Sequence, residues 1–168
     1  GSEISVASTK GFTNQVTVLA LMALMIGRTR DISLSRGKEL VRQLMDIPGK
    51  IREVLEKADE LKVMADKIKN HHSVLFMGRG INYPVAIEAA LKLKELSYLH
   101  AEAYSAGSLK HVPLALISEE IPSVFICTKG DYQEKTISNI QEVRARNGRV
   151  LVISNFEDEY LKDVADEL

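Results

Sequence analysis

The first 70 residues of the chain carry apolar positions at the spacing expected of α-helices. Residues 11–27 are apolar at most positions and carry almost no charge, which predicts a buried helix closed by Gly27 as its C-terminal cap. Apolar residues recur with helical periodicity in residues 35–45, 48–57 and 58–70, and the proline that opens the second of these segments suits a first helical turn. We therefore expect a helical segment whose first helix is buried in a core or against a partner.

A different pattern begins after residue 72, where short unbroken apolar runs alternate with helical stretches. The pattern predicts strands at residues 73–77, 123–128 and 150–154, and helices at residues 84–99, 131–146 (with Gly148 as its cap) and 157 to the end. Strands separated by helices imply right-handed crossovers and a parallel sheet covered on both faces. The predicted fold class is α/β, a Rossmann-like parallel sheet flanked by helices and preceded by a helical segment. About three strands are few for such a sheet, so we expect it to be truncated.

Composition and charge exclude several functional classes. Of the 168 residues 45% are hydrophobic, and 22 basic residues face 23 acidic ones, so no basic surface for nucleic acid is expected. Residues 16–26 are the only candidate for a membrane segment, but they are too short to span a bilayer and lack signal-peptide flanks, so we expect a cytoplasmic protein. The single cysteine, Cys127, lies in an apolar run and is predicted to be a buried structural thiol.

The predicted helix at residues 84–99 carries one narrow charged stripe on an otherwise apolar surface. Glu88, Lys92 and Glu95 fall within about 60 degrees of one another at 100 degrees per residue. The stripe is either a solvated edge tied by salt bridges or a carboxylate held beside a lysine at the rim of a cleft, where it can transfer protons. The sequence pattern leaves both interpretations open.

A loop of small residues at positions 105–113 delivers Lys110 and His111 just ahead of a proline. Loops of this kind place functional groups, although a histidine near a proline is also common as a surface or structural residue. The remaining histidines have no cysteine or carboxylate at metal-ligand spacing, so no metal is expected. We expect no cofactor either.

Two further segments have a structural and a functional interpretation each. Residues 78–84 resemble half of a dinucleotide fingerprint, but the third glycine is missing, which favours a tight turn between strand and helix. Residues 6–10 offer hydroxyl groups and a lysine ahead of a helix, with Ser8 or Thr9 as its N-terminal cap or as a contact to a polyol or phosphate.

Several of these segments together resemble, in order, the isomerase half of the glutamine–fructose-6-phosphate aminotransferase family. They are residues 3–12, 77–80, 90–98, 100–104, 109–116 and 142–148. In that family the isomerase half consists of two sugar isomerase (SIS) domains. The resemblance implies that residues 1–70 are the helical tail of the first SIS domain with connecting helices, and that residues 71–168 are most of the second.

The resemblance also implies roles for individual residues. Glu95 matches the glutamate that moves a proton between two carbons of the open-chain sugar, and Lys92 matches the lysine beside it. His111 matches the histidine that opens the sugar ring and is contributed across a homodimer interface, while Val6 and Ser8 match residues that line the sugar-phosphate pocket. The implied substrate and product are fructose 6-phosphate and glucosamine 6-phosphate, and the implied partner is a glutaminase domain.

The chain departs from the family pattern in the histidine loop. The family pattern is usually Gly-Glu-Leu-Lys-His-Gly-Pro. In this sequence Ser108 stands in place of the glutamate and Val112 in place of the second glycine. The phosphate-binding loop, the second catalytic lysine and the glutaminase domain lie outside the chain, so the isolated chain is expected to be inactive. The alternatives are a regulatory SIS module that binds a sugar phosphate without converting it and a non-catalytic interaction domain.

Overall fold

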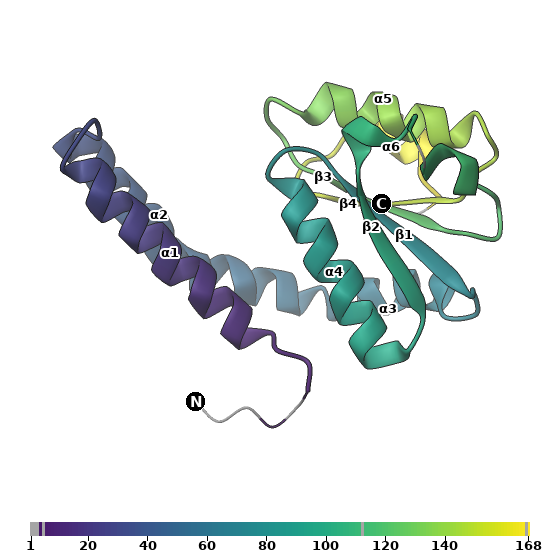
Figure 1. Ribbon diagram of the computed structural model, residues 1–168, viewed down its shortest axis with the longest axis horizontal. Helices are drawn as coiled ribbons and strands as arrows, with labels where there is room; N and C mark the ends of the chain where they lie inside the picture. Colours follow the sequence, from purple (N-terminus) through teal and green to yellow (C-terminus); the bar gives the residue numbers. More distant parts are fainter. Residues whose placement is uncertain (1–3, 5, 112, 167) are drawn as a thin grey trace. The chain divides into compact units, whose positions relative to one another are not determined.

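The computed structural model describes residues 4, 6–111, 113–166 and 168. The chain divides into two compact units, Gly1–Lys62 and Val63–Leu168, and the division falls within one helix, α3 (Ala58–Ile68). Figure 1 shows the helices of the first unit in purple and blue and the α/β second unit in teal to yellow. In the described part of the chain, no helix is both long and apolar enough to cross a membrane.

The first unit contains the helices α1 (Lys10–Arg28) and α2 (Leu34–Glu56), which lie side by side. The backbone turns between them because Ser33 caps α2, its side chain accepting a hydrogen bond from the N–H of Arg36 at 3.2 Å. The helical character predicted from the apolar spacing is therefore confirmed.

Two details predicted for this unit are wrong. The first helix ends at Arg28 with Thr29 as its cap, not at Gly27. None of its residues is buried within the unit, so the expected burial of this helix in a core or against a partner stays a prediction. The two helices predicted at residues 35–45 and 48–57 form the single helix α2, with Pro48 inside it. The proline removes one internal hydrogen bond, but the helix continues because good helix formers with the same apolar spacing flank it on both sides.

The second unit is built on four parallel strands in the order β2-β1-β3-β4. They are β1 (Ser73–Gly78), β2 (His100–Ser105), β3 (Ser123–Cys127) and β4 (Val150–Ser154). In register, Phe76 of the central strand β1 pairs with Ala103 on one side and Val124 on the other. The α/β fold with a parallel sheet is thus confirmed, whereas the expected number of three strands is wrong. β2 lacks the unbroken apolar run that marks a strand buried on both faces, because polar residues at positions 100, 102 and 104 alternate with Ala101 and Ala103.

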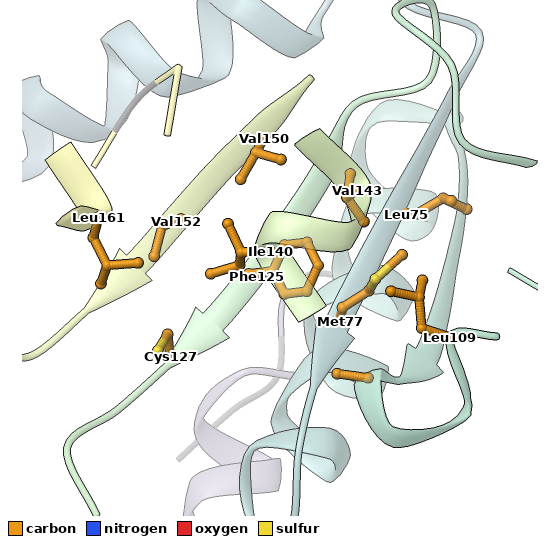
Figure 2. Close-up of a cluster of buried hydrophobic side chains, with 11 residues drawn as sticks. Leu75, Met77, Leu109, Phe125, Cys127, Ile140, Val143, Val150, Val152 and Leu161 are labelled. Carbon is orange, nitrogen blue, oxygen red and sulfur yellow. The ribbon is translucent and has the colours of Figure 1, made fainter. Parts of the chain in front are cut away.

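Helices cover both faces of this sheet, and alternate residues of each strand point to opposite sides. On one face Val74 and Phe76 pack with Ala86 and Ala90 of α4 (Asn82–Ser97), and residues of α3 add to this cluster. On the other face lie α5 (Gln133–Arg144) and α6 (Glu159–Val164), whose buried residues surround Phe125 (Figure 2). Cys127 is fully buried in the second cluster, as predicted.

The helix ends differ from the predicted ones by a few residues. The last helix stops at Val164, short of the predicted chain end, because Asp166 turns back to β4, where its backbone N–H donates to the carbonyl of Val150. Gly148 is not the cap of α5. The helix ends at Arg144, Asn147 adopts the left-handed conformation (φ 57°), and a Cβ on Gly148 would lie 2.5 Å from Val143 Cγ1. Close packing, not capping, explains that glycine.

Candidate functional site

The charged stripe on α4 forms a connected trio of side chains. Lys92 Nζ lies 2.5 Å from Glu95 Oε2 and 3.5 Å from Glu88 Oε1. The three side chains are 19% to 28% exposed. The prediction that one helix face brings them together is confirmed. Because Ala86 and Ala90 pack on the sheet, helical geometry turns the trio to the opposite, outer side of α4.

The two carboxylates set the ionisation of the lysine between them. The hydrogen bond to Glu95 raises the pKa of Lys92 above its ordinary value, the charges of Glu95 and Glu88 act in the same direction, and partial loss of water opposes them. Lys92 is therefore a cation at neutral pH. It can donate hydrogen bonds to a developing negative charge but cannot act as a base.

Apolar side chains flank the trio on the outer side of α4. Val85, Leu91 and Leu96 are 48%, 39% and 63% exposed. A helix that only borders solvent normally presents polar residues on its outer face. The charged trio therefore lies within a surface whose composition is typical of one that becomes covered.

His111 lies at the end of the loop that follows β2. Its backbone N–H donates to the carbonyl of Ser108 at 3.0 Å, and its side chain is exposed. The buried residues Leu109 and Pro113 anchor the chain on either side of it. The departure at Val112 lies outside the described residues.

The topology separates His111 from Glu95 within one copy of the unit. The 16-residue helix α4 returns from the carboxyl end of β1 to the amino end of β2 over about 24 Å, and Glu95 lies within its last turn. His111 follows the carboxyl end of β2, and its neighbour Lys110 contacts Glu142 of α5, on the other face of the sheet. Figure 1 shows the end of α4 and the segment after β2 at opposite ends of β2. The structure therefore brings Lys92 and Glu95 together but not His111.

Val6 and Ser8 precede α1 in the first unit. Val6 is 94% exposed, and Ser8 is half-buried. Thr9 occupies the N-cap position of α1, but its side chain makes no capping hydrogen bond. The predicted capping position is thus confirmed, without the predicted capping contact.

The glycine turn after β1 has the structural role predicted for it. A Cβ on Gly78 would lie 2.2 Å from the carbonyl oxygen of Asn82, and Gly80 has a φ of 57°. The buried Asn82 donates through Nδ2 to Thr128 Oγ1 at 2.8 Å, which joins the ends of β1 and β3. A pocket of about 270 Å³ lies beside this contact, lined by residues from both strand ends.

Sequence analysis misses a polar network along β2, because the sequence pattern does not predict this strand. Ser73 Oγ contacts His100 Nδ1 at 2.9 Å, and the Tyr104 hydroxyl donates to Glu102 Oε2 at 2.9 Å. That hydrogen bond, with burial and the carboxylate charge, raises the pKa of Tyr104. The residues at positions 100, 102 and 104 alternate, which is the signal that could have revealed a half-buried edge strand.

Comparison with known proteins identifies the family to which this architecture belongs. The family model described as the SIS domain matches residues 67–167. The chain belongs to the SIS-domain family. This assignment agrees with the parallel sheet and its two helical layers, and with the family resemblance of the sequence.

Relatives of this SIS-domain chain carry a common name. It is 44% identical over its whole length to a glutamine–fructose-6-phosphate aminotransferase (isomerizing) of Chlorobaculum tepidum, and 47% identical over 99% of its length to one of Bacteroides thetaiotaomicron. It also matches a solved C-terminal domain of glucosamine-fructose-6-phosphate aminotransferase from Francisella tularensis, with a TM-score of 0.92 and 37% identity over the whole chain. The chain spans 27% of each of these two relatives and 48% of the solved domain.

Proposed function

We propose that this chain is part of the isomerase portion of a glutamine–fructose-6-phosphate aminotransferase. Residues 1–70 then contribute the helical tail of the first SIS domain, and residues 71–168 contribute most of the second. The substrate is fructose 6-phosphate, the product is glucosamine 6-phosphate, and a glutaminase domain elsewhere in the full-length cytoplasmic protein supplies ammonia. The observation that carries the proposal is the Lys92–Glu95 pair at 2.5 Å, in a chain 44% to 47% identical to enzymes of that name.

The chemistry of the pair suits ketose-to-aldose conversion. Glu95 removes a proton from one carbon of the open-chain sugar and returns it to the neighbouring carbon, so the carboxylate is unchanged after the cycle. Lys92 remains a cation beside it and stabilises the negative charge that develops on the substrate oxygen. Val6 and Ser8 line the sugar-phosphate pocket in this proposal.

His111 acts from a second copy of the chain. A ring-opening group must come within hydrogen-bond reach of the sugar that Glu95 holds, and one copy of the unit places the two residues near opposite ends of β2. The exposed apolar residues beside the trio on α4 support a partner surface at this position. Two-fold symmetry would then build two equivalent sites, each with Glu95 from one copy and His111 from the other.

The first test is Glu95→Gln in the full-length enzyme. The amide keeps the shape but not the base, so exchange of the substrate C–H proton with solvent deuterium, followed by NMR, should fall by roughly a hundred-fold or more. Binding of fructose 6-phosphate should change little. Glu159→Gln removes the same charge from an exposed position on α6 and serves as the matched control. Near-normal exchange in Glu95→Gln would place the proton transfer elsewhere, and sugar-phosphate binding without any exchange in the unaltered enzyme would indicate a regulatory module.

The second test is complementation between two inactive variants. If each site combines two copies, a mixed dimer of Glu95→Gln and His111→Ala has one site with both residues intact. Random mixing should then restore roughly a quarter of the full activity, since half of the dimers are mixed and each has one intact site. No recovery after verified subunit exchange would show that both residues act within one copy.

A further inference from the structure

The loop that carries His111 makes an ion pair with α5 next to the histidine. Lys110 Nζ lies 3.2 Å from Glu142 Oε1. The lysine side chain is 71% exposed, whereas the glutamate side chain is only 27% exposed. The contact therefore joins an exposed lysine of the loop to a partly buried carboxylate of α5.

The carboxylate of Glu142 is partly buried without enough hydrogen bonds to offset the loss of water. Its Oε2 atom is buried and has no hydrogen-bond partner among the described residues. A buried carboxylate oxygen without a partner costs stability, and an ion pair whose lysine is mostly exposed returns little of that cost. Stability of the fold alone therefore does not account for a glutamate at this position.

A second polar contact, between Arg79 and α5, lies beside the same loop. Arg79 Nη1 donates to Asn139 Oδ1 at 3.3 Å, and Asn139 lies three positions before Glu142 on α5. A Cβ on Gly107 would lie 3.3 Å from the same Arg79 nitrogen, so the loop rests closely on the guanidinium group. The first half of the loop thus lies against Arg79, which is hydrogen-bonded to α5, and Lys110–Glu142 joins the residue before His111 to α5 directly.

We infer that Glu142 is a positioning residue for the ring-opening step. It acts through Lys110 to fix the position of the His111 loop relative to α5. The inference rests on the proposed function, because it assumes that His111 reaches a substrate. The buried Leu109 and Pro113 hold the two ends of the loop, and backbone hydrogen bonds from His111 to Ser108 and from Leu114 to Leu109 close the turn between them. The ion pair adds a side-chain contact that joins this turn to α5 beside the histidine. A small error in placing an acid–base group is enough to slow the step that it catalyses.

The test uses the full-length enzyme with Glu142→Gln, Lys110→Met and the reversed pair Lys110→Glu with Glu142→Lys. We expect each single variant to lower kcat with cyclic fructose 6-phosphate by about tenfold while KM changes less than about twofold. Proton exchange with an open-chain substrate analogue, which needs Glu95 but no ring opening, should stay near the normal rate. Lys162→Met breaks an exposed ion pair of 2.9 Å with Glu157 and should leave both rates unchanged.

Coupling separates positioning from general damage. The double variant Lys110→Met with Glu142→Gln should be no slower than either single variant, and the reversed pair should recover kcat to within about threefold of normal. Additive losses, no recovery in the reversed pair, equal losses in both assays, or single variants within about twofold of normal kcat would each overturn the inference. Full activity of Glu95→Gln or His111→Ala would instead overturn the proposed function.

Discussion

Replacing Gly78 by alanine should destabilise the α/β unit more than any solvent-exposed substitution. The added Cβ would lie 2.2 Å from the carbonyl oxygen of Asn82, 2.5 Å from its carbonyl carbon and 2.8 Å from the nitrogen of Tyr83. These atoms are backbone in the first turn of α4, so no side chain can rotate away. The start of the helix must move by about 1 Å to restore an ordinary contact distance.

Two costs follow from that movement. Overpacking of this kind costs about 1–3 kcal/mol. The shift also displaces Asn82 from Thr128, whose part-buried hydrogen bond of 2.8 Å contributes about 1 kcal/mol. The sum is about 2–4 kcal/mol, a large share of the roughly 5–15 kcal/mol that holds a domain folded.

Hydrogen exchange followed by mass spectrometry measures this cost in the α/β unit alone. The slowest amides of β1 and β3 should exchange about 30- to 1,000-fold faster in Gly78→Ala, because they open with the whole unit. Gly49→Ala is the matched control, since a Cβ there meets nothing within 4 Å and alanine is favoured inside a helix by about 0.5–1 kcal/mol. It should leave β1 and β3 unchanged. Exchange in Gly78→Ala as slow as in the unaltered chain would refute the steric argument.

Two further predictions concern the core and the chain end. Burial, with a smaller effect of the Asp158 charge, raises the pKa of Cys127 to about 11 from 9.0, so stability that is present below pH 9 should fall as the pH rises towards 11. Alkylation of Cys127 at pH 8 should be at least about a hundred-fold slower in the folded than in the urea-unfolded chain, and equal rates would contradict its burial. Asp166→Ala should cost about 1–3 kcal/mol in urea denaturation, because Asp166 Oδ2 accepts from the buried N–H of Val150 at 2.7 Å and from Arg144 at 2.9 Å. Asp166→Asn retains an acceptor and should recover part of that loss.

The strands predicted from sequence are those buried on both faces. β1, β3 and most of β4 are unbroken apolar runs, since residues of each strand pack into the buried clusters on both faces of the sheet. β2 differs because only one of its faces is apolar. Ala101 and Ala103 pack beneath α4, while His100, Glu102 and Tyr104 alternate with them on the other side. Alanine is a weak strand former, so neither composition nor hydrophobicity reveals this strand.

The helical unit shows a different limit of sequence analysis. The apolar character of residues 11–27 correctly indicates a helix, but periodicity cannot say what covers it. Within the described residues α1 has no buried position. The break expected at Pro48 fails for a related reason: the local cost of a proline is outweighed by helix-forming residues on both sides.

Local and long-range parts of the candidate site are predictable to different degrees. Lys92 and Glu95 are one helical turn apart, so their contact follows from helix geometry alone. Two other contacts, Lys110–Glu142 and Asn82–Thr128, join elements that are far apart in the sequence. Their pairing depends on the strand order, which the sequence does not reveal. Sequence analysis therefore names the catalytic candidates but misses these contacts between separate elements.

The α4 trio is a charged group that stays partly open to water in the single chain. In one copy Lys92 is held charged by two carboxylates, and all three side chains keep some contact with water. Proton transfer at carbon is favoured where water is excluded and the charges around the substrate are fixed in advance. The apolar residues beside the trio would supply that exclusion once another surface covers them. In the proposed dimer, a covering copy that also brings His111 would close the site and complete its chemistry in one step.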